Sequence, residues 1–477
     1  MYLKKVILIL VFLMAVLFSQ TIKVSNNDRY LIKDDKPFLW LGDTAWELFH
    51  KLNREEADHY LETRAEQGFS VIQAVVLAEN DGLRVPNPYG EVPFENFDPT
   101  QPNKKYFEHV DYIVNKANEL GLVVGMLPTW GDKVFSEHPA AGPIVFNEKN
   151  AEVFGEFLGK RYRNADLVWI LGGDRNIANL EVLNLWRGMA KGLRKGDDGN
   201  HLITYHPRGG TSSSYWLHNE KWLDFNFFQS GHGQHYNTVY EFAETDRLKR
   251  PVKPTIDGEP AYEDIAVKFW DYCDWSLPKR APDSVMDDDF LIKDKSYFKE
   301  GFFTDYDVRI HAYWNFLSGA CGYTYGNNAV WQMFKKGGPI AIPCLYDWKE
   351  SLQRPGANDI RHIRKLFQAR SIGALVPDQS IIYGMNPKNE DYIVAASVME
   401  GQSLLIYLAK GQPVDVVMKK IAGKKSTAKW FDPRTGEVTE IGEVKNDGIQ
   451  KFTPPSSGKD NDWVLVLDSK SAKLPKW

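Results

Sequence analysis

Short apolar runs alternate with amphipathic stretches between residues 37 and 370, as they do in repeated strand–helix units. Eight of the apolar runs have the length of buried strands: 38–41, 71–76, 122–127, 167–171, 201–206, 225–229, 254–258 and 322–326. Helical patterns follow most of them, at 103–120, 150–163, 179–195, 304–318 and 357–370, with a long excursion at 264–303. Eight such units predict an α/β fold, a (β/α)8 TIM barrel.

Terminal residues support the helix boundaries. Asn53 is a suitable N-cap for a helix that follows the first strand, with Glu56 at the capping-box position. Gly121 closes the 103–120 helix, because glycine adopts the left-handed conformation that ends many helices.

After Arg370 the pattern changes to short runs with a period of two, at 392–396, 403–408, 414–418 and 463–467. Turn sequences such as 432–436 separate these runs, which is typical of a small antiparallel β-sandwich. We therefore expect a catalytic barrel over 21–372 and a C-terminal β-sandwich domain over 373–477. The sequence contains no low-complexity linker, so the two domains should pack closely.

The N-terminus has the pattern of an export signal. Lys4 and Lys5 precede an apolar run from Val6 to Phe18, which is shorter than the roughly 20 residues of a membrane span. We predict a signal peptide over 1–20 and an exported, periplasmic or secreted protein without a membrane segment after its removal. An uncleaved N-terminal anchor is the alternative interpretation.

Composition limits the partners. The net charge of −5 provides no basic surface for nucleic acid, and the 15 Trp and 22 Tyr suit a protein that stacks sugar rings, although many must be core. The three cysteines allow at most one disulfide, and the absence of zinc-type spacings leads us to expect neither a metal nor a cofactor. The oligomeric state is not readable from the sequence.

Polar or aromatic residues stand at or just beyond the ends of the predicted strands. They are Asp43, Gln73, Trp130, Asp174, His206, Gln229, Glu259 and Tyr325. Active sites of this fold lie at the carboxyl ends of the strands, so these residues predict a functional mouth there.

Two of these residues suit the cleavage of glycosidic bonds, which usually needs a pair of carboxyl groups. Asp174 follows Gly172-Gly173 after the fourth strand, and Glu259 stands between Gly258 and Pro260 after the seventh. Strand position makes them the catalytic pair, because acids at these two positions recur in retaining barrel glycosidases. Other acids compete for the same roles: Asp43, Glu79, Asp132, Asp257 and Glu263.

Further residues around the mouth are expected to bind the substrate. His232 and His235 follow the sixth strand and, with His206, could suggest a metal pair, but no carboxylate accompanies them at ligand spacing. Hydrogen bonds from histidine to sugar hydroxyls are the preferred interpretation. The complete expected set is Asp43, Trp46, Gln73, Glu79, Trp130, His206, Gln229, His232, Tyr325 and Trp331.

Three motifs add a family resemblance. The stretches 40–48 (WLGDTAWEL) and 73–79 (QAVVLAE) resemble the apiosidase-like barrel of glycoside hydrolase family 140. The turn 430–436 (WFDPRTG) resembles its companion C-terminal domain, which bears a collagen-binding label. The resemblance covers nearly the whole chain after residue 20.

The resemblance implies an exo-acting, retaining apiosidase that removes apiose from the pectin rhamnogalacturonan-II. It assigns Asp174 as acid/base and Glu259 as nucleophile, with a pectic oligosaccharide as the partner. Two alternatives stay open: a glycosidase of the same barrel family that acts on another glycan, and a non-catalytic glycan- or matrix-binding protein.

Overall fold

The computed structural model describes residues 22–135 and 142–477. The predicted signal peptide, residues 1–20, lies outside the described residues, so it stays a prediction.

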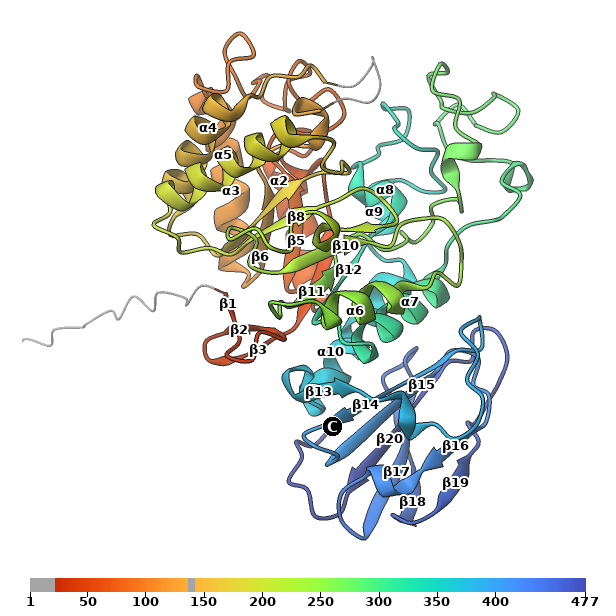
Figure 1. Cartoon of the computed structure of the whole chain (residues 1–477). Helices are drawn as coiled ribbons and strands as arrows, with labels where there is room; N and C mark the ends of the chain where they lie inside the picture. Colours follow the sequence, from red (N-terminus) through yellow and green to blue (C-terminus); the bar gives the residue numbers. More distant parts are fainter. Residues whose placement is uncertain (1–21, 136–141) are drawn as a thin grey trace, which may run out of the picture.

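The described part of the chain contains a barrel in which eight parallel strands follow one another around the sheet (Figure 1). The strands are β4 (Trp40–Thr44), β5 (Val71–Val75), β6 (Val123–Leu127), β7 (Leu167–Gly172), β8 (Ile203–His206), β10 (Asn226–Gln229), β11 (Thr255–Asp257) and β12 (Gly322–Tyr325). A short ninth strand, β9 (Thr211–Ser212), pairs antiparallel with β10. The Asp224 amide donates to the Ile203 carbonyl at 2.9 Å and joins β8 to the chain before β10. The predicted TIM barrel is confirmed.

The barrel strands are apolar on both faces, which explains why they appear in the sequence as continuous apolar runs. In β7, Val168 and Ile170 pack in the cluster inside the barrel. Trp169 and Leu171 pack in the cluster between the sheet and the helices. Side-chain alternation thus assigns neighbouring residues to two different environments.

Helices surround the sheet (Figure 1). The longer ones are α2 (Arg54–Glu66), α3 (Lys104–Glu119), α4 (Glu148–Tyr162), α5 (Leu180–Gly196), α6 (Val239–Leu248), α7 (Asp305–Leu317) and α10 (Pro355–Ala369). The Asn53–Glu56 capping box of α2 is present, and Gly121 has a φ of 76° after α3. Within 22–135 and 142–477 no helix combines the length and apolar character that a membrane crossing needs.

The C-terminal region forms an antiparallel sheet with the order β13-β14-β15-β20-β17-β18, beside a two-stranded sheet of β16 and β19. The strands are β13 (Leu375–Pro377), β14 (Ile393–Val398), β15 (Ser403–Leu408), β16 (Val414–Val417), β17 (Lys425–Phe431), β18 (Val438–Lys445), β19 (Ile449–Phe452) and β20 (Trp463–Ser469). The predicted antiparallel sandwich is confirmed, and it also contains β17, β18 and β19, which the sequence pattern did not reveal. A hairpin sheet of β1 (Lys23–Val24), β2 (Leu31–Lys33) and β3 (Lys36–Phe38) precedes the barrel.

The central strands β15 and β20 of the larger C-terminal sheet are buried on both faces, whereas the edge strand β18 is largely exposed. In β15, Leu404 and Ile406 pack with β16 and β19 in the core of the sandwich. Leu405 and Tyr407 face the other way and join the core of the barrel. The Tyr407 ring stacks on Tyr313 of α7, with centroids 4.8 Å apart. One face of the sheet therefore belongs to the apolar core of the barrel, and the other face to the core of the sandwich.

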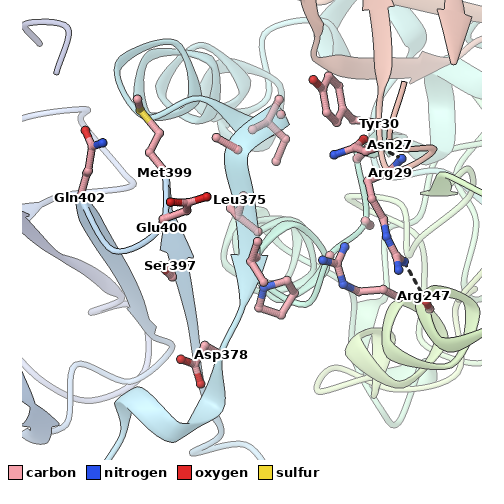
Figure 2. A pocket seen from close by; sticks show the side chains of 18 residues that line it. Asn27, Arg29, Tyr30, Arg247, Leu375, Asp378, Ser397, Met399, Glu400 and Gln402 are labelled. Carbon is pink, nitrogen blue, oxygen red and sulfur yellow. Dashed lines mark hydrogen bonds between the residues drawn. The ribbon is translucent and has the colours of Figure 1, made fainter. Parts of the chain in front are cut away.

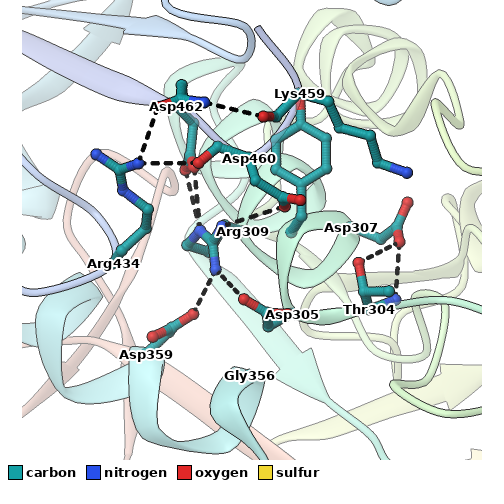
Figure 3. Close-up of polar contacts among 12 residues, drawn as sticks. Thr304, Asp305, Asp307, Arg309, Gly356, Asp359, Arg434, Lys459, Asp460 and Asp462 are labelled. Atoms are coloured by element: carbon teal, nitrogen blue, oxygen red, sulfur yellow. Dashed lines mark hydrogen bonds and ion pairs between the residues drawn. The ribbon is translucent and has the colours of Figure 1, made fainter. Parts of the chain in front are cut away.

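The contact between the two parts leaves a cavity of about 720 Å³ beside the N-terminal hairpin (Figure 2). At another place, the barrel and the sandwich are joined by a buried ionic network around Arg309 of α7 (Figure 3). Arg309 Nε lies 3.1 Å from Asp462 of the sandwich, and its Nη1 lies 2.8 Å from Asp359 of α10. The side chains of Arg309 and Asp462 are 2% and 0% exposed, so neither charge is solvated by water.

Replacing Arg309 with Ala should lower the free energy of unfolding by about 3–5 kcal/mol, because buried Asp462 and Asp359 would lose their counter-charge. Chemical denaturation of the full chain measures the change. Lys388→Ala is the matched control, since the Lys388–Glu244 pair also joins the two parts but is largely exposed. It should cost no more than about 1 kcal/mol. Equal effects of the two substitutions would contradict the role given to the Arg309 network.

Candidate active site

Asp174 leaves the end of β7 in an unusual backbone conformation. Gly172, Gly173 and Asp174 all have positive φ, of 87°, 108° and 53°. A Cβ on Gly172 would lie 2.3 Å from the His206 carbonyl oxygen, so glycine is required there. The turn presents an Asp174 side chain that is 36% exposed at the mouth.

The turn that carries Glu259 after β11 is also closely packed. A Cβ on Gly258 would lie 1.6 Å from the Phe227 ring, and the Gly258 carbonyl accepts a 3.1 Å hydrogen bond from Gln73 Nε2. Asp257, one residue earlier, accepts hydrogen bonds from Ser230 Oγ at 2.7 Å and from Asn315 of α7 at 2.8 Å. These contacts hold the strand end that carries Glu259.

His206 lies between the two carboxyl-bearing turns. The Asp174 backbone N–H donates to His206 Nδ1 at 3.3 Å, and His206 Nε2 lies 2.8 Å from Glu259 Oε2. On the other side of Glu259, His232 Nε2 lies 3.2 Å from Oε1. Two imidazoles thus contact the two carboxylate oxygens of Glu259, whereas Arg175 Nη1 lies 3.8 Å from the Asp174 carboxyl.

The surroundings shift the two pKa values in opposite directions. Burial raises the pKa of Asp174 to about 6, and the negative charge of Glu259 adds to that effect. Burial also acts to raise the pKa of Glu259, but the contacts with His206 and His232 outweigh it and lower that pKa to about 2. Glu259 is therefore charged across the neutral and mildly acidic range, and Asp174 titrates within that range.

Aromatic side chains form the wall beside the pair. The Trp46 ring lies 5.2 Å from Trp130 and 5.4 Å from His206. Trp46 Nε1 donates to the Tyr262 hydroxyl at 3.0 Å, and burial and the charge of Glu259 raise the pKa of Tyr262. Trp331 packs in the same apolar cluster. Tyr262 was not predicted from the sequence; its only signal was an aromatic residue shortly after Glu259.

The remaining polar candidates surround the pair at different depths. Glu79 is half-buried, and burial together with the charges of Asp132 and Asp174 raises its pKa to about 8. Gln229 is 5% exposed near Gly209, and its Oε1 lacks a hydrogen-bond partner among the described residues. Gln73 lies deeper, where it holds Gly258, and so positions the strand end rather than facing the mouth.

Asp43 and Tyr325 are not brought into this group, which corrects the expectation that they line the mouth. Cα atoms of the two residues are paired between β4 and β12, so both side chains point to the outer face of the sheet. There the Arg64 guanidinium of α2 donates to Asp43 at 2.7 Å, and the Tyr325 hydroxyl donates to Glu263 at 2.6 Å. Both are fully buried between sheet and helices.

The described residues contain no group of three or more His, Cys, Asp or Glu side chains placed to hold a metal ion. His235, considered above as a possible metal ligand, instead pairs with Asp307 at 2.8 Å. Cys273, Cys321 and Cys344 are free thiols, so none of them forms the disulfide that the sequence permitted.

Two family models match the chain. The model of the apiosidase-like catalytic domain matches residues 25–373. This chain belongs to the apiosidase-like family. Residues 376–468 match the domain described as "putative collagen-binding domain of a collagenase". No curated protein sequence matches the chain.

Solved structures extend the likeness across both parts of this apiosidase-like protein. A structure described as a glycoside hydrolase shares 32% identity with a TM-score of 0.82, covering 95% of this chain and 98% of that one. A glycoside hydrolase family 5 protein from Bacteroides vulgatus shares 31% identity with a TM-score of 0.80, covering 95% and 94%. The protein is thus a glycoside hydrolase whose substrate is a carbohydrate.

In an apiosidase-like hydrolase of this geometry, Gly258 should tolerate no side chain. We expect Gly258→Ala to lower kcat by about 10²-fold or more, because the new methyl would displace Phe227 or the turn that carries Glu259. Gly233→Ala is the control, since nothing lies within 4 Å of its added Cβ, and it should retain activity within about twofold. Circular dichroism verifies folding in both; full activity in folded Gly258→Ala would contradict the required contact.

Proposed function

We propose that this glycoside hydrolase is a retaining, exo-acting apiosidase that releases apiose from rhamnogalacturonan-II side chains, with Asp174 as acid/base and Glu259 as nucleophile. The observation that carries the catalytic assignment is the opposite pKa shift of two strand-end carboxyl groups that share His206. Carboxyl pairs whose surroundings separate their pKa values divide into an acid and a charged partner.

The proposed mechanism is a double displacement. Glu259, charged because His206 and His232 contact its oxygens, attacks the anomeric carbon while Asp174 donates its proton to the leaving oxygen. Once Glu259 is esterified its charge is lost, and with it one cause of the raised pKa of Asp174. Asp174 then accepts a proton more readily from the water that releases the sugar.

The sugar is the finer part of the proposal. Support for apiose comes from the description of the matching family, and support for a pectic substrate follows from it. We further propose that the protein is exported, on the basis of its N-terminal sequence. The collagen label of the C-terminal family leaves a matrix-binding protein as the second candidate.

Incubation of the protein with rhamnogalacturonan-II fragments should release apiose, identified by mass spectrometry and by the anomeric configuration of the first product in proton NMR. Glu259→Gln should lower the rate by more than about 10³-fold without loss of folding. Asp271→Asn, at an exposed acid of the same loop, is the matched control and should retain the rate. Release of a different sugar would contradict the proposed substrate. An unchanged rate in Glu259→Gln would contradict the assignment of Glu259 as the nucleophile.

The rate should also depend on pH in a direction set by the two shifts. The first step needs protonated Asp174 and charged Glu259, so kcat/KM should be flat in mild acid and fall about tenfold per pH unit above about 6. Asp174→Asn should remove that fall for an aryl glycoside with a good leaving group, which needs no proton donor. If the variant kept the same fall, another group would be the acid.

A further inference from the structure

The cavity shown in Figure 2 lies between the hairpin and the sandwich, and its place along the barrel strands sets it at the end opposite Asp174 and Glu259. It is lined by Arg247 at the end of α6 and by Cys321 just before β12, at the amino ends of strands β11 and β12. Asp174 and Glu259 follow the carboxyl ends of their strands. The cavity is therefore separate from the candidate active site.

Two arginines occupy the barrel side of the cavity. Arg29 Nη1 donates to the Arg247 carbonyl at 2.7 Å. This contact places the Arg29 guanidinium at the C-terminus of α6, where the helix dipole stabilises its positive charge. The Arg247 guanidinium has no hydrogen-bond acceptor or carboxylate partner among residues 22–135 and 142–477. Burial, and then the positive charge of Arg29, lower the pKa of Arg247 to about 10. A half-buried guanidinium that lies beside a like charge and lacks a carboxylate partner would be stabilised by an anion that approaches it.

The opposite wall offers a different chemistry. Leu375, Pro377 and Met399 contribute apolar surface, and Ser397 and Gln402 contribute a hydroxyl and an amide. Asp378, on the same wall, is neutralised by Lys420 at 3.1 Å. Glu400 remains across from the arginines (Figure 2) and would repel a second negative charge.

We propose that this cavity binds the carboxylate of an acidic sugar. The carboxylate would accept paired hydrogen bonds from Arg247, the apolar face of the ring would lie on Pro377 and Leu375, and hydroxyls would reach Ser397 and Gln402. Glu400 restricts the site to one anionic group at the arginine side. The choice of a sugar as carrier of the carboxylate rests on the proposed function, whereas the anion chemistry rests on the arginines alone.

Calorimetric titration of the full chain with trigalacturonate tests the site, because this ligand carries sugar carboxylates but no apiose. Binding is expected, and it should weaken at least tenfold in Arg247→Met and at high salt. The neutral trigalactoside should not bind. Arg250→Met, at an exposed neighbouring arginine, is the matched control and should leave the affinity within about twofold.

Three outcomes would overturn the proposal: no binding of trigalacturonate, equal affinity in Arg247→Met, or binding of inorganic phosphate as tight as that of the sugar. Arg247→Lys guards against a folding defect, since it keeps the charge without the paired geometry and should bind with intermediate affinity. Turnover of a small aryl apioside should be unchanged in both Arg247 variants. If the wild-type protein released no apiose, that result would contradict the proposed function but would not affect the binding result.

Discussion

The structure depends on a β-sheet whose central strands, β15 and β20, are buried on both faces. Along β15, alternate side chains go to two cores, with Leu404 in the sandwich and Leu405 in the barrel. A sandwich with one face exposed could be removed from a barrel at small cost, but here removal would expose a row of large apolar side chains on both partners. The C-terminal region is accordingly part of the folding unit of the hydrolase.

Helix α7 carries that constraint to the active site. Its residues from Tyr306 to Leu317 are all buried, because one side meets the sandwich and the other meets the loops of the barrel mouth. Arg309 and Tyr313 contact the sandwich, while Asn315 holds Asp257 next to Glu259. Rigid support of this kind keeps a charged carboxylate in place between two imidazoles. The position of the nucleophile candidate therefore depends on packing far from the mouth.

The sequence predicted the barrel because buried parallel strands form long apolar runs, and it proposed Asp174 and Glu259 as a pair because they follow the fourth and seventh strands. It did not reveal which strand-end side chains face inward: Thr44 faces the barrel interior, but Asp43, one position earlier, faces Arg64. Which of two neighbouring residues faces inward depends on the register of the strand, and the register is determined by pairing with the neighbouring strands. The sequence pattern did not predict strand β18, because its exposed edge is rich in Glu and Lys. It also did not predict helix α6, because that helix is short.

The distance between the proposed carboxylate site and the candidate active site also limits what the carboxylate site can do. Arg247 precedes β11 and Glu259 follows it, so the barrel separates the two along the length of its strands. One monosaccharide cannot contact both. A site of this kind cannot orient the scissile bond, and would act instead by retaining a long acidic glycan and raising the local concentration of its other branches at the mouth. Its effect on catalysis should then grow with the length of the substrate and vanish for a single glycoside, which separates retention from chemistry in one chain.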